Sequence, residues 1–213
     1  MRVGLHALLV SVRVTTRAEP SRGQVAATLA AIGGSALVLF VTAPSIAIGA
    51  TNLHGITAAA AEAATRVAML VVYLLLVSRS RGAAQLFRYH GAEHKTIRAF
   101  ERLGRVPFLK EARDVGPIHD RCGTNFAMLF VLCAGVVYAI VPRSPLWVGA
   151  LWRVVLVPLV GSLAYELMRL AAHEERELWA RIVVWPGRAA QRLTTAEPGD
   201  DELDVAIAAL TAL

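Results

Sequence analysis

The sequence predicts an all-α protein, built as a polytopic membrane helical bundle with about four transmembrane helices. Of its 213 residues, 56% are hydrophobic, which is more than a soluble domain of this size usually carries. Four apolar stretches are long enough to cross a bilayer, and polar or basic segments separate them. A chain of this length leaves no room for a second large domain.

Each predicted span is a mostly apolar run bounded by polar residues, glycine or proline. The runs are about Gln24 to Ala50, Ile56 to Ser78, Phe126 to Val141 and Leu146 to Ala172. Pro44 is expected to end or kink the first span, because proline has no N–H to donate. The third run is the shortest. Its helix is expected to begin near Gly123 or Thr124, with Thr124 or Asn125 as the cap.

Two of the predicted spans contain ionisable side chains. Glu62 and Arg66 are four residues apart in the second span, so we expect them to form an ion pair inside the bundle. Glu166 and Arg169, three residues apart in the fourth span, are expected to pair in the same way. Arg153 is expected to extend to the outer membrane interface, with its aliphatic stem in the apolar layer.

The distribution of basic residues predicts the orientation of the chain in the membrane. Ten Lys or Arg residues lie between positions 79 and 121, and further arginines precede the first span and follow the fourth. By the positive-inside rule, both termini and the 79–125 loop are cytoplasmic. The formal net charge of +6 is explained mainly by this topology, so it gives no separate reason to expect a nucleic-acid partner. The predicted environment is the lipid bilayer, and a membrane or cytoplasmic protein is a candidate partner.

This orientation divides the chain into five segments. They are a cytoplasmic amphipathic segment (1–23), a transmembrane hairpin (24–78), a cytoplasmic module (79–125), a second transmembrane hairpin (126–172) and a cytoplasmic tail (173–213). In the module, Leu86 to Leu103 is predicted as a helix that Gly104 ends, and Lys110 to Pro117 is predicted to be turn-rich.

The tail is predicted to follow the membrane edge without crossing it. Trp179 and Trp185 indicate an interfacial segment, and Pro186 with the following glycine is expected to turn the chain. Apolar residues at helical spacing then predict a short amphipathic helix that docks on the cytoplasmic module. They are Leu203, Ile207 and Leu210.

The cytoplasmic module contains residues that are typical of a metal site. His90 and His94 are four apart, so on a helix their imidazoles point the same way, and Glu93 lies beside them. The order His-x-x-Glu-His matches the inverted form of the zinc-hydrolase helix, in which both histidines bind the metal and the glutamate acts on a bound water. His119 and Cys122 follow with two residues between them, a spacing common in zinc sites.

These residues predict a divalent metal, with zinc favoured by the mixture of imidazole and thiolate donors. The predicted ligands are His90, His94, His119 and Cys122, with Cys122 either a fourth ligand or a nearby thiol. Glu93 is the predicted general base, and Lys95 or Arg121 is predicted to stabilise an anionic substrate or intermediate. Glu101, about three turns along the same helix, is a further candidate oxygen donor.

The sequence leaves two functional classes open. If only three residues bind the metal, a position stays open for chemistry, and the protein is a metal-dependent hydrolase-like enzyme. If four bind, the site is closed, and the protein is a non-enzymatic membrane scaffold whose structural zinc helps it to dock a partner protein. In either case the predicted fold is a membrane bundle with a cytoplasmic metal-binding helix–loop module.

These motifs resemble the YqhQ-like family of bacterial membrane proteins, also called domain of unknown function 1385. The likeness covers about Ala68 to Leu213. The matching segments are Tyr89 to Thr96, His119 to Thr124, Leu159 to Leu170, and Gln191 to Thr195 with Glu197 and Pro198. The resemblance implies a multi-pass protein of the bacterial inner membrane and a predicted metal-dependent enzyme, but no substrate. There are two departures: Asp120 stands where the family usually has proline, and the glycine-rich N-terminal module of many members is missing.

Overall fold

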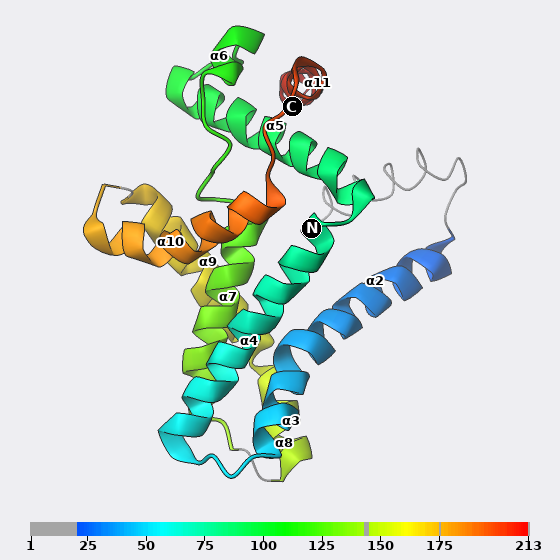
Figure 1. Cartoon of the computed structure of the whole chain (residues 1–213), viewed down its shortest axis with the longest axis vertical. Helices are drawn as coiled ribbons and strands as arrows, with labels where there is room; N and C mark the ends of the chain where they lie inside the picture. The colour runs from blue at the N-terminus through cyan, green and yellow to red at the C-terminus, as the bar shows by residue number, and fades with distance from the viewer. Residues whose placement is uncertain (1–20, 143–144, 175, 213) are drawn as a thin grey trace.

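The computed structural model describes residues 21–142, 145–174 and 176–212, and within these ranges all regular structure is helical. Three helical stretches are long and apolar enough to cross a membrane, and a bent pair of helices is a fourth candidate span. The prediction of an all-α chain is therefore confirmed, and where about four transmembrane helices were predicted the structure has three to four candidate spans. The predicted amphipathic segment at 1–23 lies almost entirely outside the described residues. Figure 1 shows the candidate spans as a bundle, with α5, α6 and α11 beyond one end of it.

The first candidate span is interrupted by a π-helical turn. It consists of α2 (Arg22–Leu37), the π-helix η1 (Val38–Thr42) and α3 (Ala43–Gly49). Pro44 lies in the first turn of α3, and without an N–H it cannot bond the Phe40 carbonyl four residues earlier. Pro44 was expected to end or kink the span; instead the helix changes from α to π before it. The Phe40 carbonyl is then available to a donor from another helix.

The second and third spans are in close contact. They are α4 (Gly55–Ser78) and α7 (Gly123–Val137), and α7 continues into the 3-10 turn η2 (Tyr138–Ile140). A Cβ on Gly135 would lie 2.9 Å from the Ala63 Cβ, so a glycine is needed where these helices meet. The N-cap of α7 is Cys122, whose sulfur accepts from the backbone N–H of Thr124; the predicted caps, Thr124 and Asn125, lie inside the helix.

The fourth span differs from the single helix that the sequence predicts. It is two helices, α8 (Leu146–Val155) and α9 (Val157–His173), which the break at Leu156 bends by 44° when the described parts of both are compared. Pro158, in the first turn of α9, removes the N–H that would have bonded the Val154 carbonyl, which accounts for the break.

The spans enclose a cluster of charged side chains from α4 and α8. Figure 1 shows that α8 lies beside α3 at one end of the bundle. Glu62 pairs with Arg66, as predicted, and it also accepts from Arg153 Nε at 3.0 Å. The prediction that Arg153 extends to the interface is wrong, since only 1% of its surface is exposed. Arg66 Nε donates to the Phe40 carbonyl at 3.1 Å, so the interrupted first span supplies one of its acceptors. Each buried cation therefore has a partner that offsets the cost of leaving water.

Four helices lie outside the candidate spans. They are α5 (Arg81–Leu103), α6 (Leu109–Arg113), α10 (Leu178–Thr194) and α11 (Asp200–Thr211). Gly104 ends α5 with a left-handed φ of 67°, as predicted. The expected turn at Pro186 is wrong, because α10 continues through this residue and packs along α7 and α9. The short helix α6 occupies part of the segment that was predicted to be turn-rich.

The predicted amphipathic helix at the C-terminus is α11, and it packs on α5 and α6. Leu203 is buried with Ala92 and Ala112, and Ile207 packs against the same cluster. This contact holds α11 against the helix that carries both histidines of the motif.

Candidate metal centre

Three of the predicted ligands come together at one end of the bundle. The donor atoms of His90, His94 and Cys122 all lie within 4.8 Å of one another. His90 Nε2 is 3.3 Å from Cys122 Sγ, and the centroids of the two imidazole rings are 4.3 Å apart. Two nitrogens and one sulfur at these separations match the distances between ligands that share one transition-metal ion.

Backbone carbonyls fix both imidazoles in the form that a metal requires. His90 Nδ1 lies 2.8 Å from the Thr194 carbonyl oxygen, and His94 Nδ1 lies 2.7 Å from that of Pro117. A carbonyl only accepts, so each Nδ1 carries the hydrogen, and in neutral imidazole the Nε2 lone pair is then free to bind a cation. A hydrogen bond from the second ring nitrogen to a carbonyl is the usual support of metal-binding histidines.

The segment after α10 reaches the site because Gly91 has no side chain. The Ala196 N–H donates to the Phe87 carbonyl at 2.9 Å, which places this segment against α5. A Cβ on Gly91 would lie 2.1 Å from the Ala196 oxygen. Gly91, between the two histidines of the motif, therefore allows the segment after α10 to pack on α5, and this packing places the Thr194 carbonyl beside His90.

Cys122 has an acidic thiol in this environment. Burial raises the pKa of Cys122, but hydrogen bonds from His90, His94 and the Thr124 N–H, with the nearby charge of His94, together lower it to about 5. The hydrogen bond to Cys122 raises the pKa of His90 in turn. In the metal-free protein the Cys122 thiol is thus easily deprotonated, and a bound cation would stabilise the same thiolate.

We expect the metal-free protein to hold Cys122 as a thiolate at neutral pH and to lose it as the pH falls through about 5. Thiolate ultraviolet absorbance of the apoprotein, with Cys122→Ser as the blank, measures this titration. His90→Ala should move the midpoint upward, because it removes the first donor to the sulfur. A midpoint near the ordinary thiol value of about 8.5 in the unmodified chain would contradict the assignment.

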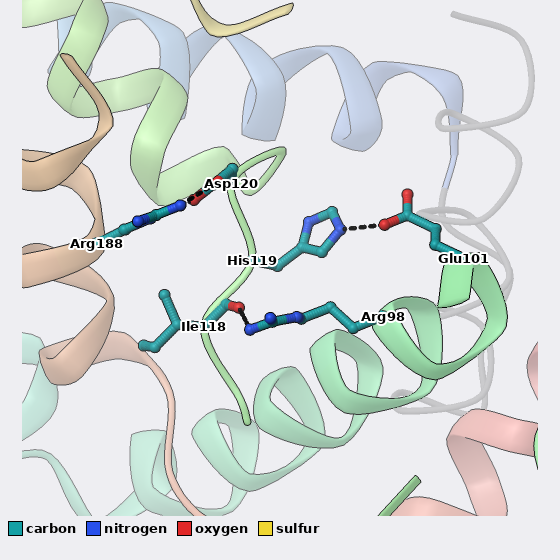
Figure 2. A pocket seen from close by; sticks show the side chains of 6 residues that line it. All are labelled: Arg98, Glu101, Ile118, His119, Asp120 and Arg188. Carbon is teal, nitrogen blue, oxygen red and sulfur yellow. Dashed lines mark hydrogen bonds and ion pairs between the residues drawn. The ribbon is translucent and has the colours of Figure 1, made fainter. Parts of the chain in front are cut away.

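His119, the remaining predicted ligand, lies beside this group but outside it. Its ring centroid is 5.8 Å from that of His94. Its Nε2 is 3.2 Å from Glu101 Oε2, and its Nδ1 accepts the Arg121 backbone N–H at 3.2 Å, so both nitrogens are occupied. Figure 2 shows the imidazole turned toward Glu101. As a fourth ligand, His119 would have to leave the carboxylate of Glu101, which was predicted as a separate oxygen donor.

The three residues with predicted catalytic roles lie in different surroundings. Glu93 is exposed and lines a cavity of about 410 Å³ between α5 and α11. Lys95 is buried and forms an ion pair with Glu197. Arg121 is largely exposed, and its Nη1 lies 3.3 Å from Glu101 Oε1. Their catalytic roles stay predictions, and Glu93 would act only on a group that reaches its side of α5.

A polar cavity of about 270 Å³ adjoins His119 (Figure 2). Arg98 donates to the Ile118 carbonyl at 2.7 Å, and Asp120 accepts from Arg188 Nε at 2.6 Å. Asp120, the departure from the family pattern, thus anchors the loop before Cys122 to α10.

Sequence reasoning missed Gln191 and the two carbonyls that orient the histidines. The Gln191 side chain accepts from the His119 N–H at 3.0 Å and donates to the His119 carbonyl at 2.8 Å, so it fixes the loop from α10. The only sequence signal was the Gln191 to Thr195 segment of the family motif. A backbone carbonyl has no residue type that a pattern could reveal.

The comparisons with known proteins agree on one family. A family model described as "Protein of unknown function (DUF1385)" matches residues 1–213. The chain belongs to this family. The "Uncharacterized protein YqhQ" of Bacillus subtilis (strain 168) is 32% identical over 149 residues, which are 70% of this chain and 46% of that protein. The chain thus aligns with less than half of this DUF1385 relative. No solved structure matches the chain.

Membership of DUF1385 confirms the family that the motifs predicted. Neither description assigns a metal, a reaction or a membrane topology. For this DUF1385 chain, a metal and a reaction can therefore be proposed only from its own residues.

Proposed function

We propose that this protein is a membrane enzyme of the metal-dependent hydrolase type, with one divalent transition metal held by His90, His94 and Cys122. The observation that carries the proposal is the pair of imidazoles whose Nδ1 atoms bond backbone carbonyls, so that their other nitrogens converge with one sulfur. Mixed nitrogen and thiolate donors favour zinc over magnesium or calcium, which prefer oxygen.

The number of donors favours an open site. Within the described part of the chain, the group contains three donors, and the fourth predicted ligand is hydrogen-bonded elsewhere. Zinc with three protein ligands keeps a position for water or substrate, and such a metal lowers the pKa of bound water toward neutrality. The protein would hold the donors in a fixed geometry. The helix α5 carries both histidines, and the Pro117 carbonyl and the Thr194 carbonyl at the end of α10 fix their rings.

We expect the purified protein to carry about one metal ion per chain, and the His90→Ala, His94→Ala double variant to carry almost none. His119→Ala should keep the metal, because its ring bonds Glu101 instead. Elemental analysis after purification without added metal is the measurement. Equally low metal in the unmodified and double-variant proteins would refute the site, and loss of metal from His119→Ala would show a closed four-ligand centre.

Cobalt-substituted protein separates an open site from a closed one. Azide should change the visible spectrum of bound cobalt if a coordination position is open. No change, together with metal loss in His119→Ala, would favour the second candidate function.

That second candidate is a non-enzymatic scaffold in which a structural zinc ion would link α5 to α7. One observation favours it: the three donors link α5, outside the candidate spans, to the N-cap of α7, which is itself part of a candidate span. Metal binding would then contribute mainly to folding and to docking of a partner protein.

The proposed location is the cytoplasmic side of a bacterial inner membrane, with both termini inside, and it rests on the basic residues near the site. We expect a membrane-impermeant maleimide to label Asn52→Cys in intact cells and to miss Ser80→Cys, above the background of the unmodified protein. Both positions are exposed and lie at opposite ends of α4. The reverse pattern would place the metal centre outside the cell.

A further inference from the structure

An apolar chamber of about 700 Å³ lies between α2, α4 and α7, with one residue from α9. Its walls are almost entirely carbon, and α2, α4 and α7 each belong to a stretch long and apolar enough to cross a membrane. In Figure 1, α2 diverges from α4 and α7 toward the end of the bundle where α5 lies. In a bilayer, a chamber bounded by such helices has lipid chains as its neighbours.

The chamber reaches the metal centre. Gly123 and Thr124 line it, and they directly follow Cys122 in the chain. The Thr124 N–H lies 3.4 Å from Cys122 Sγ, and the Thr124 hydroxyl is 3.1 Å from that of Thr194, whose carbonyl bonds His90. The residue next to the donor Cys122 in the chain thus lines the apolar chamber.

Positive charge gathers near the same end of α7. Arg121, Arg169 and His173 line a cavity of about 370 Å³. Each arginine pairs with one carboxylate, yet the two side chains are 60% and 63% exposed, so further N–H donors of each guanidinium can reach an anion. Arg121 lies two residues before Gly123, which lines the chamber, so its exposed guanidinium offers N–H donors to a phosphate close in the chain to the Cys122 end of the chamber.

We propose that the ligand of this site is a membrane lipid with an anionic head group. One acyl chain occupies the chamber, and the head group lies at the Cys122 end, beside the arginines. The inference rests on the proposed function, because it names the substrate class of that metal centre. It makes α2, which diverges from α4 in Figure 1, a wall of a substrate site.

Two neighbouring glycines of α2 provide the test. A Cβ on either Gly33 or Gly34 meets no heavy atom within 4 Å, but only Gly33 lines the chamber. Gly33→Phe should place a benzyl group in the chamber and narrow it, and Gly34→Phe adds the same side chain outside it. The probe is phosphatidylglycerol with a photoactivatable diazirine in one acyl chain, present as a trace component of phosphatidylcholine nanodiscs that contain the full chain.

We expect the photolabel to concentrate on chamber residues such as Leu74 and Ala127, to fall several-fold in Gly33→Phe and to stay unchanged in Gly34→Phe. A probe with a phosphatidylcholine head group should label the chamber less. Equal labelling of both variants, or label spread equally over exposed residues such as Val136 and Ile140, would mean surrounding bilayer lipid only and overturn the proposal. Equal labelling by the two probes would overturn the anionic head group.

Elemental analysis of the same samples keeps the two proposals apart. Both glycine variants should retain the metal, since α2 provides none of its ligands. Chamber labelling without metal would leave the lipid site and remove the metal centre. Bound metal without chamber labelling would leave the metal centre and remove the lipid site.

Discussion

Glu62→Gln is expected to destabilise the protein by about 3–5 kcal/mol, as measured by detergent or thermal denaturation. The carboxylate of Glu62 accepts from Arg66 and Arg153, and all three side chains are almost fully buried. Neutral glutamine would leave two guanidinium groups without a counter-charge in the apolar part of the bundle. The loss measures the cost of two unpaired buried cations more than the strength of one contact.

The chain contains a matched control for this experiment. Glu166 and Arg169 also form an ion pair, at 2.7 Å, but 49% of the glutamate side chain is exposed. Glu166→Gln should therefore cost much less than Glu62→Gln, because it leaves no cation buried in the bundle without a counter-charge. Replacing Glu62 and both of its arginines by methionine should recover much of the stability, because no buried charge remains. A loss from Glu62→Gln as small as that from Glu166→Gln would contradict the burial of the cluster.

Gly91→Ala is expected to weaken metal binding by about 10–100-fold, without removing a ligand. The new methyl would lie 2.1 Å from the Ala196 oxygen, so the segment after α10 has to move away from α5. The Thr194 carbonyl would then lose His90, and Glu197 would lose Lys95. Metal affinity by competition with a chelator measures the first effect, and thermal stability the second.

Gly82→Ala is the control for the effect of alanine on helix α5 itself, because it makes no contact with Ala196. Gly82 lies on the same helix, and nothing lies within 4 Å of its added Cβ. Alanine is a better helix former than glycine, so this variant should be neutral or slightly stabilising and should keep its metal affinity. Equal metal affinity in the two alanine variants would show that the segment after α10 does not position His90.

The sequence predicted the long apolar helices, the motif helix α5, the C-terminal helix α11 and most of the donor set, because these follow from local rules. The spacing of His90 and His94 is sufficient to place two imidazoles on one face of α5. The pairing of Glu62 with Arg66 is equally local. Arg153 was predicted wrongly because its partner is 91 residues away in the chain, and no spacing rule reaches that far.

Contacts across the fold also explain the other differences. The separation of His119 from the donor group depends on Glu101 and on a loop held by Gln191, neither of which follows from residue spacing. The break in the fourth span has a visible cause in Pro158, but a similar proline, Pro186, leaves α10 continuous. A proline removes one hydrogen bond in both cases, and the surrounding packing decides whether the helix ends.

The π-helical turn η1 gives the first span two parts with different attachments. The Ser45 hydroxyl of α3 bonds Glu62 at 2.7 Å, whereas most residues of α2 are exposed. The direction of α2, and with it the width of the chamber, is therefore set by the few residues of η1. Removing one residue from this turn would rotate α2 by about 100° and replace the face that carries Gly33 with another. The backbone length of a single turn thus determines which side of a 16-residue helix faces the proposed lipid.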